Sequence, residues 1–320
     1  MKIKAVGMIS GGLDSILATK MMVEMGIEVF GFNTKTPFCL CSQHSGGCGD
    51  AAKICHDLGI SFKMMSITEE FLEVLINPKY GYGSNMNPCI DCRVLLFKKA
   101  KEYMDEVGAQ FMFTGEVVGQ RPKSQFIPTL RQIDKAAGVA GLVLRPLSAQ
   151  LLDPTIPEKE GWLDRDQLLS ISGRSRKPQF KLAEELNVKD YPCSAGGCLL
   201  TDPNFAGHLK DLFDHGVYDL NSIQLIKAGR QFRFSPKTKI TIGRHEKDNR
   251  IIANLAKEDD VLLEVIDYFG PLTIVRGDCE EEAILQAAQY TKRYSDIRDG
   301  VEIEVKAYKP DGSYTKIFKI

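Results

Sequence analysis

The sequence has no long hydrophobic run and no signal peptide. None of its apolar segments approaches the roughly 18 residues that a membrane span requires. The start, Met1-Lys2-Ile3-Lys4, leads into a short apolar segment, not the longer apolar region of a secretory signal. A composition of 43% hydrophobic and 26% charged residues is that of an ordinary globular protein. We therefore expect a cytoplasmic protein without membrane contact, and 320 residues favour two or three domains.

The sequence also lacks an overall positive charge, since its formal net charge is -1. The basic residues are nevertheless clustered. Segment 227–250 holds eight of them against two acids, and the run 174–181 holds four and no acid. Such patches can attract a polyanion on a neutral protein, although a solvated face is the alternative interpretation. The candidate anion-binding residues are Arg121, Arg174, Arg176, Lys177, Arg230, Arg233 and Arg244.

The first half of the chain alternates short apolar runs with amphipathic stretches. Strands are expected at 3–9, 27–33, 60–67, 110–114 and 142–144, and helices at 13–25, 49–58, 90–107 and 124–137. This alternation predicts a doubly wound parallel α/β sheet, in which sites form beyond the carboxyl ends of the strands. Residues 1–150 are therefore expected to form the first domain.

The pattern changes after about residue 146. Residues 151–220 form a proline-containing connecting region, with weak helices expected at 166–171 and 179–186. From 221 to 320 a smaller α+β domain is expected. Its strands are expected at 239–242, 261–265, 273–275, 302–308 and 313–320, with one helix at 280–294.

A phosphate-binding turn follows the first strand, at residues 10–15 with the sequence Ser-Gly-Gly-Leu-Asp-Ser. Two glycines let backbone N–H groups approach an anion, and the following helix start adds unsatisfied donors and its dipole. The turn resembles the pyrophosphate loop of the PP-loop ATPases, which cleave ATP between the α and β phosphates. The Walker and dinucleotide patterns are both absent. The expected nucleotide-binding residues are Ser10, Gly11, Gly12, Asp14, Ser15, Thr114, Gly115 and Gln120, with Mg²⁺ beside Asp14.

Two further segments narrow the resemblance. Residues 113–120, followed by 142–147, resemble the catalytic domain of ThiI-type 4-thiouridine synthases. Residues 86–93, Met-Asn-Pro-Cys-Ile-Asp-Cys-Arg, are similar to a segment of both ThiI-type and MnmA-type thiouridylases. The chain starts at the PP-loop strand, so we expect neither the N-terminal RNA-binding region of ThiI proteins nor a rhodanese domain.

The tail resembles the NFACT-R (DUF814) domain, which is associated with RNA in translation-related proteins. The matching residues are Ala228-Gly229-Arg230, Ile242-Gly243-Arg244, Asp248-Asn249, Phe269-Gly270-Pro271 and Arg293-Tyr294-Ser295-Asp296. The basic run lies inside this region, so we expect it to supply RNA contacts.

Nine cysteines in a reducing compartment favour metal or catalytic roles over disulfides. Cys89 and Cys92 form a CxxC at a helix start, and Cys198 lies in a glycine-flanked turn. By resemblance to related thiouridylases, these three would hold a [4Fe-4S] cluster whose open iron binds the sulfur donor, with Cys193 as the alternative third ligand. A metal-free thiol pair of Cys92 and Cys198, or a zinc site, are the competing hypotheses.

The other cysteines are less informative. Cys39, Cys41 and Cys48, with His44 between them, could form a second metal site or a sulfur-entry relay. Cys55 follows on a helix face that we expect to be buried, and Cys279 is expected to be structural.

Together these features predict an ATP-dependent tRNA sulfurtransferase. The catalytic residues would be Asp14, Cys89, Cys92 and Cys198. A uridine carbonyl is adenylated, and sulfur from sulfide or a cysteine desulfurase persulfide then replaces AMP; 4-thiouridine is favoured over 2-thiouridine. The alternatives are a PP-loop sulfur transferase or amidating enzyme acting on a small molecule, and an RNA-binding translation factor with a vestigial ATP site.

Overall fold

The computed structural model describes residues 2–39, 48–189, 191, 198–297 and 300–320. The chain divides into two compact units, Met1–Asp202 and Pro203–Ile320, each treated by itself. The boundaries near 150 and 220 expected from the sequence remain predictions. Among the described residues, no helix combines the length and the apolar character that crossing a bilayer requires.

Unit 1 is built on a five-stranded parallel sheet with the order β3-β2-β1-β4-β5. The strands are β1 (Lys4–Met8), β2 (Glu28–Lys35), β3 (Ser61–Ser66), β4 (Phe111–Thr114) and β5 (Val143–Leu144). Since β1 lies centrally and the chain passes to both of its sides, the carboxyl end of β1 is the switch point where such folds bind ligands. The predicted doubly wound parallel sheet is confirmed.

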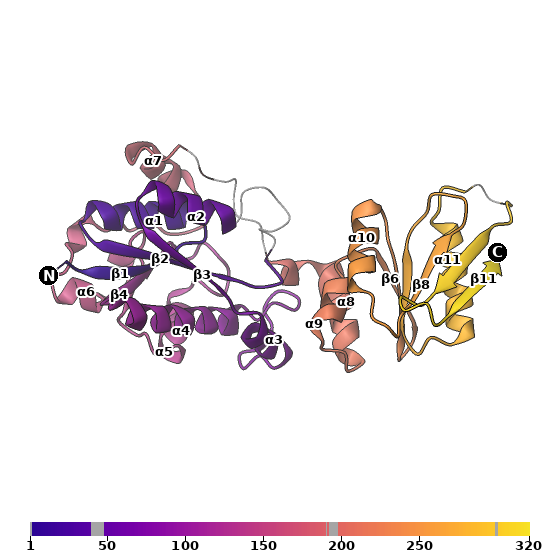
Figure 1. Cartoon of the computed structure of the whole chain (residues 1–320). Coiled ribbons are helices and arrows are strands. Elements are labelled where there is room, and N and C mark those ends of the chain that lie inside the picture. Colours follow the sequence, from indigo (N-terminus) through magenta and orange to yellow (C-terminus); the bar gives the residue numbers. More distant parts are fainter. Residues whose placement is uncertain (1, 40–47, 190, 192–197, 298–299) are drawn as a thin grey trace. The chain divides into compact units, whose positions relative to one another are not determined.

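Helices cover both faces of this sheet (Figure 1). On one face lie α1 (Leu13–Glu24) and α2 (Cys48–Asp57), and on the other α4 (Cys89–Val107) and α5 (Ile127–Ala136). Side chains of β1 alternate between two cores: Ala5 packs with Leu17 on the α1 face, and Val6 packs with Phe97 on the α4 face. This period of two follows from strand geometry, and burial on both faces explains the continuous apolar runs.

Shorter elements complete unit 1. They are α3 (Thr68–Ile76), α6 (Ile156–Lys159) and α7 (Lys177–Glu185), with 3₁₀ turns at Ala149–Leu151, Arg165–Gln167 and Leu199–Thr201. The prediction of a helix at 166–171 was wrong, because only the 3₁₀ turn Arg165–Gln167 forms there. Asp164 caps this turn, and its side chain accepts a hydrogen bond from the Asp166 N–H. The helix expected at 179–186 is confirmed as α7.

Unit 2 is a six-stranded antiparallel sheet with the order β11-β10-β8-β9-β7-β6. The strands are β6 (Arg230–Ser235), β7 (Thr238–Ile242), β8 (Val261–Val265), β9 (Thr273–Gly277), β10 (Glu304–Tyr308) and β11 (Thr315–Lys319); the helices are α8 (Pro203–Asp214), α9 (Leu220–Leu225), α10 (Glu246–Leu255) and α11 (Glu281–Arg293). Val261 and Leu263 of β8 pack in the core that α11 closes, while Leu262 packs with Ile252 of α10 in a second core.

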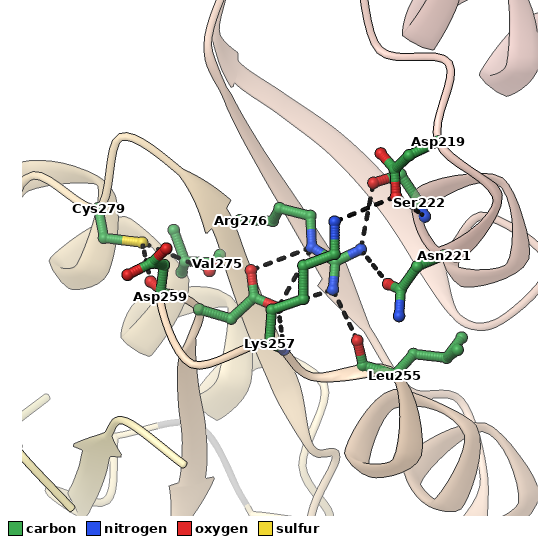
Figure 2. Close-up of polar contacts among 10 residues, drawn as sticks. Asp219, Asn221, Ser222, Leu255, Lys257, Asp259, Val275, Arg276 and Cys279 are labelled. Atoms are coloured by element: carbon green, nitrogen blue, oxygen red, sulfur yellow. Dashed lines mark hydrogen bonds and ion pairs between the residues drawn. The ribbon is translucent and has the colours of Figure 1, made fainter. Parts of the chain in front are cut away.

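Arg276 of β9 forms an ion pair with Asp260, and its further hydrogen bonds connect the sheet of unit 2 to α9 and α10 (Figure 2). Arg276 of β9 donates to Asp260 at 2.7 Å, to the Asn221 side chain at 2.7 Å and to the Leu255 carbonyl at 2.8 Å. The side chains of Arg276 and Asp260 are 14% and 3% exposed. Because the guanidinium has several partners, the desolvation of both charges is compensated within the unit.

Candidate active site

The predicted phosphate loop lies between β1 and α1, at the carboxyl end of the central strand. Gly11 has φ +83°, a left-handed conformation that favours glycine. Gly12 is the N-cap of α1 and offers no side-chain cap, so an anion can take the place of one. Ser15 donates to the Gly12 carbonyl at 2.8 Å, and Ser10 lies 3.3 Å from the Ser15 hydroxyl. The loop therefore has the geometry expected of an anion-binding turn.

Gly115, directly after β4, touches the backbone of the phosphate loop. A Cβ atom at this position would lie 2.4 Å from the Asp14 carbonyl carbon and 2.5 Å from the Ser15 nitrogen. No side chain fits there, because both neighbours are backbone atoms. Thr114 is buried and turns inward, where its hydroxyl lies 3.3 Å from Glu116 Oε2. Of these two predicted nucleotide residues, Gly115 therefore shapes the loop and Thr114 supports Glu116.

A chain of two glutamines holds Asp14. Gln120 Nε2 donates to Asp14 Oδ2 at 2.7 Å, and Gln179 Nε2 of α7 donates to Gln120 Oε1 at 2.9 Å. Three buried atoms around this chain have no hydrogen-bond partner in the protein. They are Asp14 Oδ1, Gln179 Oε1 and Arg176 Nε, just before α7. A buried polar atom without a partner is costly, so these atoms are suited to a polar ligand such as hydrated Mg²⁺ and phosphate. Gln179 could not be assigned to the site from the sequence, since it lies in α7, far along the chain from Asp14.

A buried acidic residue lies beside this loop. Glu116 is 3% exposed and pairs with Arg145 at 3.1 Å and Arg93 at 3.4 Å. Burial opposes ionisation of Glu116, but the two arginines outweigh it and lower the pKa of the carboxyl. Arg145 in turn donates two bonds to Asp134, at 2.8 and 2.9 Å. This network fixes the segment that carries Gly115 and Gln120.

The predicted cysteines come together at the start of α4. Burial raises the pKa of Cys92 to about 12, and negative charge on Cys198, Cys89 and Cys39 adds to the increase. Burial likewise raises the pKa of Cys198 to about 11 and raises that of Cys89. These three thiols are therefore protonated at neutral pH and need a nearby positive charge, a metal or a reaction partner to become thiolates.

Cys39 is a fourth member of this group, and the sequence analysis left its role open. It forms an antiparallel β-bridge with Cys198. Its position could have been inferred from the sheet, because Cys39 follows β2, whose carboxyl end lies beside that of β1. Cys55 is buried against Ile9 and Ala51 and is a core residue, while Cys41, Cys193 and His44 lie outside the described residues, as does the side chain of Cys48.

Thiolates suit an iron–sulfur or zinc site in their chemistry, but their placement does not complete one. Within the described ranges, no three Cys, His, Asp or Glu side chains are placed to hold a metal ion. The assignment of a [4Fe-4S] cluster to Cys89, Cys92 and Cys198 therefore remains a prediction.

Arg121 connects the phosphate loop with the cysteines. It keeps an exposed surface, yet partial burial and the charge of Arg93 lower its pKa, while Glu116, Cys89 and Asp14 act in the opposite direction. One guanidinium thus lies within electrostatic reach of both Asp14 and Cys89. Nucleotide and sulfur chemistry can therefore meet around this residue.

The predicted anion-binding residues differ in whether they are exposed or already form ion pairs within the protein. Arg174 and Lys177 are exposed near α7, and the Arg176 guanidinium lies 5.5 Å from the Phe180 ring centroid. In segment 227–250, five of the eight basic residues form ion pairs within unit 2; these are Arg233, Lys237, Lys239, Arg244 and Arg250. The run is therefore less available to a polyanion than its sequence suggests.

Several motif residues of the tail hold one loop of unit 2. Asn249 Oδ1 accepts from the Leu272 N–H at 3.0 Å, and a Cβ at Gly243 would lie 1.9 Å from that oxygen. Arg230 places its guanidinium 4.4 Å from the Tyr294 ring centroid. The same loop exposes Tyr268 by 53% and Phe269 by 90%. The sequence analysis quoted Phe269 within a motif but assigned it no role.

The fold is that of a HUP or PP-loop-like α/β unit followed by a separate α+β unit built on an antiparallel sheet. Residues 3–138 match the family described as tRNA methyl transferase HUP domain, and residues 229–320 match the NFACT protein RNA binding domain. Each match covers less than half of the chain, the first within unit 1 and the second within unit 2. The predicted pairing of a thiouridylase-like PP-loop domain with an NFACT-R domain is confirmed.

Curated relatives are tRNA thiouridylases. The tRNA-specific 2-thiouridylase MnmA of Symbiobacterium thermophilum is 33% identical over 128 residues, 35% of this chain and 33% of the relative. That of Clostridium botulinum strain Alaska E43 is 25% identical over 254 residues, 75% of this chain and 63% of the relative. The chain thus spans less than two thirds of these relatives. A solved 4-thiouridine synthetase–RNA complex with bound ATP resembles it distantly, with 21% identity, a TM-score of 0.37 and coverage of 58% of this chain and 51% of that one.

Proposed function

We propose that this chain is a tRNA sulfurtransferase that uses ATP to activate a uridine carbonyl and replaces its oxygen with sulfur. The observation that carries the proposal is the turn at the carboxyl end of the central strand β1, where Asp14 Oδ1 is buried and has no protein hydrogen-bond partner. The curated relatives named tRNA-specific 2-thiouridylases support the substrate class.

ATP is expected to lie over the turn at residues 10–15. Backbone N–H groups of Gly11 and Gly12 and the start of α1 would bind phosphate oxygens, and Asp14 Oδ1, which lacks a protein partner, would orient hydrated Mg²⁺. The uridine oxygen attacks the α-phosphorus, pyrophosphate leaves, and Arg121 offsets the developing negative charge. The oxygen is then part of a good leaving group, AMP.

Sulfur delivery takes place at the cysteines at the start of α4. A [4Fe-4S] cluster on Cys89, Cys92 and Cys198 would supply an iron site for hydrosulfide when bound. A thiol route needs no metal, but it needs a persulfide donor and a reductant that restores the thiols. The high pKa values of Cys92 and Cys198 protect both from unwanted oxidation before substrate arrives. Resemblance to ThiI-type synthases favours O4 as the replaced oxygen, whereas the names of the curated relatives favour O2.

Unit 2 and the α7 region would bind the tRNA. Arg174 and Lys177 are exposed for phosphate contacts, and the half-buried Arg176 lies between them in the sequence. In unit 2, Phe269 is the aromatic side chain best placed to stack on an unpaired base, since it is 90% exposed. The target uridine must leave its stack to reach Asp14 and the cysteines.

The test is a single-turnover reaction of anaerobically purified protein with ATP, Mg²⁺, unmodified tRNA and either sulfide or a persulfide donor. Nucleoside mass spectrometry should show thiouridine together with AMP, and both should be lost in Asp14→Asn. Cys198→Ser should lose thiouridine. AMP formation without any thiolated nucleoside, under either sulfur source, would redirect the proposal to a small-molecule acceptor. Iron and sulfide assays of the same protein decide whether a cluster is present.

A further inference from the structure

Cys39 and Cys198 face each other across a short antiparallel bridge that joins two segments far apart in the sequence. The Leu199 N–H donates to the Phe38 carbonyl at 3.1 Å. These are the residues after Cys198 and before Cys39, so the two cysteines form the non-hydrogen-bonded type of pair. In such a pair the Cα atoms are about 4.5 Å apart and both side chains project from the same face.

This register satisfies the main requirement for a disulfide. Disulfides join residues with Cα separations of about 4.4–6.8 Å, so the backbone need not move. Both residues are reduced in the structure. Cys89 and Cys92, by contrast, are both held on the first turn of α4 and have no such paired register with Cys198.

The segment carrying Cys198 is held in place from its other side. The Met86 N–H donates to the Leu200 carbonyl at 3.2 Å, and the Asn85 side chain donates to the Thr201 carbonyl at 2.7 Å. The Thr201 hydroxyl donates to the Cys198 carbonyl at 2.6 Å. Cys198 is thus fixed between the loop before α4 and the segment after β2, while the Cys39 thiol lies 3.3 Å from the Thr36 hydroxyl.

We infer that Cys39 is the resolving thiol that releases the thiolated base from Cys198. This role rests on the proposed function and assigns the resolving step to Cys39, not to the CxxC. It requires two reactants from outside the chain: a persulfide donor that loads Cys198, and a dithiol reductant that restores both thiols after each turnover.

The reaction balances as follows. The terminal sulfur of the Cys198 persulfide attacks the adenylated carbon and AMP leaves, which gives a base–S–S–Cys198 adduct. The Cys39 thiolate attacks the Cys198 sulfur, and the electron pair of the broken S–S bond passes to the sulfur on the base. The base sulfur is reduced and, with the proton from Cys39, is released as thiouridine. Cys39 and Cys198 are left oxidised as a disulfide, which the dithiol reduces by two electrons.

The first experiment tests the pair without tRNA. The full chain is treated with the thiol oxidant diamide and digested without reduction, and disulfide-linked peptides are identified by mass. A Cys39–Cys198 peptide is expected, and it should be absent from Cys39→Ser while Cys279→Ser retains it. Cys198 linked to Cys89 or Cys92, with no Cys39–Cys198 peptide, would overturn the inference whatever the enzyme's activity.

The second experiment is a single turnover with tRNA and a persulfide donor but no added dithiol. Cys39→Ser should release AMP in one burst and accumulate a protein–tRNA adduct, from which added dithiothreitol frees thiouridine. Cys39→Ala should give the same AMP burst and the same adduct as Cys39→Ser. Thermal unfolding curves that match that of the unmutated chain would show that both variants are folded. Release of thiouridine by both variants at the unmutated rate would overturn the resolving role. If the unmutated chain itself makes no thiouridine, the proposed function fails, and the oxidation experiment still decides the pairing.

Discussion

The two units differ in whether their buried polar side-chain atoms have hydrogen-bond partners. In unit 1, buried side-chain atoms of Asp14, Glu116, Arg176 and Gln179 lack a hydrogen-bond partner, and among the described residues no such atom occurs in unit 2. In unit 2 the largely buried Arg276, 14% exposed, is hydrogen-bonded to side chains and to a backbone carbonyl. Unsatisfied polar atoms reduce stability, so their concentration around one loop indicates that a ligand completes that site. The buried atoms without a partner are thus concentrated at the predicted nucleotide site of unit 1.

The largest expected effect tests the close approach in unit 1. Gly115→Ala should lower ATP turnover by at least about a hundred-fold, because its Cβ would displace the Asp14 backbone by an ångström-scale shift. AMP release measures this loss. Gly207→Ala in α8 is the matched control, since a Cβ there meets nothing within 4 Å. An active Gly115→Ala would contradict the assigned geometry.

The next effect tests the role of polar groups in unit 2. Arg276→Met should lower the free energy of unfolding by about 3–5 kcal/mol, because Asp260 is left buried and unpaired. Urea unfolding measures it, and AMP turnover per folded molecule should not change. The control is Arg250→Ala, whose ion pair with Glu246 is exposed and contributes at most about 1 kcal/mol. Equal losses of unfolding free energy in Arg276→Met and Arg250→Ala would contradict a stabilising role for the Arg276 ion pair.

A pH dependence in unit 2 should follow from Asp211. Burial alone would raise the pKa of its carboxyl, but hydrogen bonds from Arg233 and Lys239 lower it from 3.8 to about 2. The pKa is lower in the folded state, so the stabilisation is complete above pH 4 and is lost as the pH falls through 2. The shift corresponds to about 2 kcal/mol. Unfolding curves measured between pH 6 and 2 should show this loss of stability. The Asp211→Asn variant should have a lower free energy of unfolding at pH 6, and that free energy should depend less on pH.

The smallest effect separates binding from stability in unit 1. Gln179→Leu removes the support of Gln120 and Asp14, so the KM for ATP should rise about tenfold. The free energy of unfolding should change by less than about 1 kcal/mol, because an unsatisfied buried oxygen is removed with the lost bond. Gln150→Leu, at an exposed glutamine, serves as the control. A large loss of stability without a change in KM would assign Gln179 to the fold instead.

Local patterns predicted much of the fold. The five parallel strands, α1, α4 and the phosphate loop follow from apolar runs and glycine positions that a single segment contains. The helices and strands missed were α3, α6, α8, α9, α10 and β6. All side chains of β6 are half-buried, so it shows no clear alternation, and α8 begins at Pro203 within a region interpreted as a connector.

The site was predictable only where its residues lie in one motif. Asp14 and Gly115 were found because each follows a strand of the sheet. Gln179 and the pairing of Cys39 with Cys198 were not, since they depend on contacts between segments far apart in the sequence; Gln179 and Gln120 are 59 positions apart. The basic run of the tail was overestimated, because ion pairs such as Arg233–Asp211 depend on α8, which the sequence did not reveal.

If ATP activates a uridine carbonyl, as we propose, the oxygen of that carbonyl can be followed directly into AMP. tRNA carrying ¹⁸O at uridine O4, or in a second sample at O2, is incubated with the protein, ATP, Mg²⁺ and a persulfide donor, and AMP is analysed by mass spectrometry. We expect one of the two labels to move into AMP in step with thiouridine formation, which also identifies the replaced oxygen. Unlabelled AMP from both samples, with both labels retained in the tRNA, would contradict it.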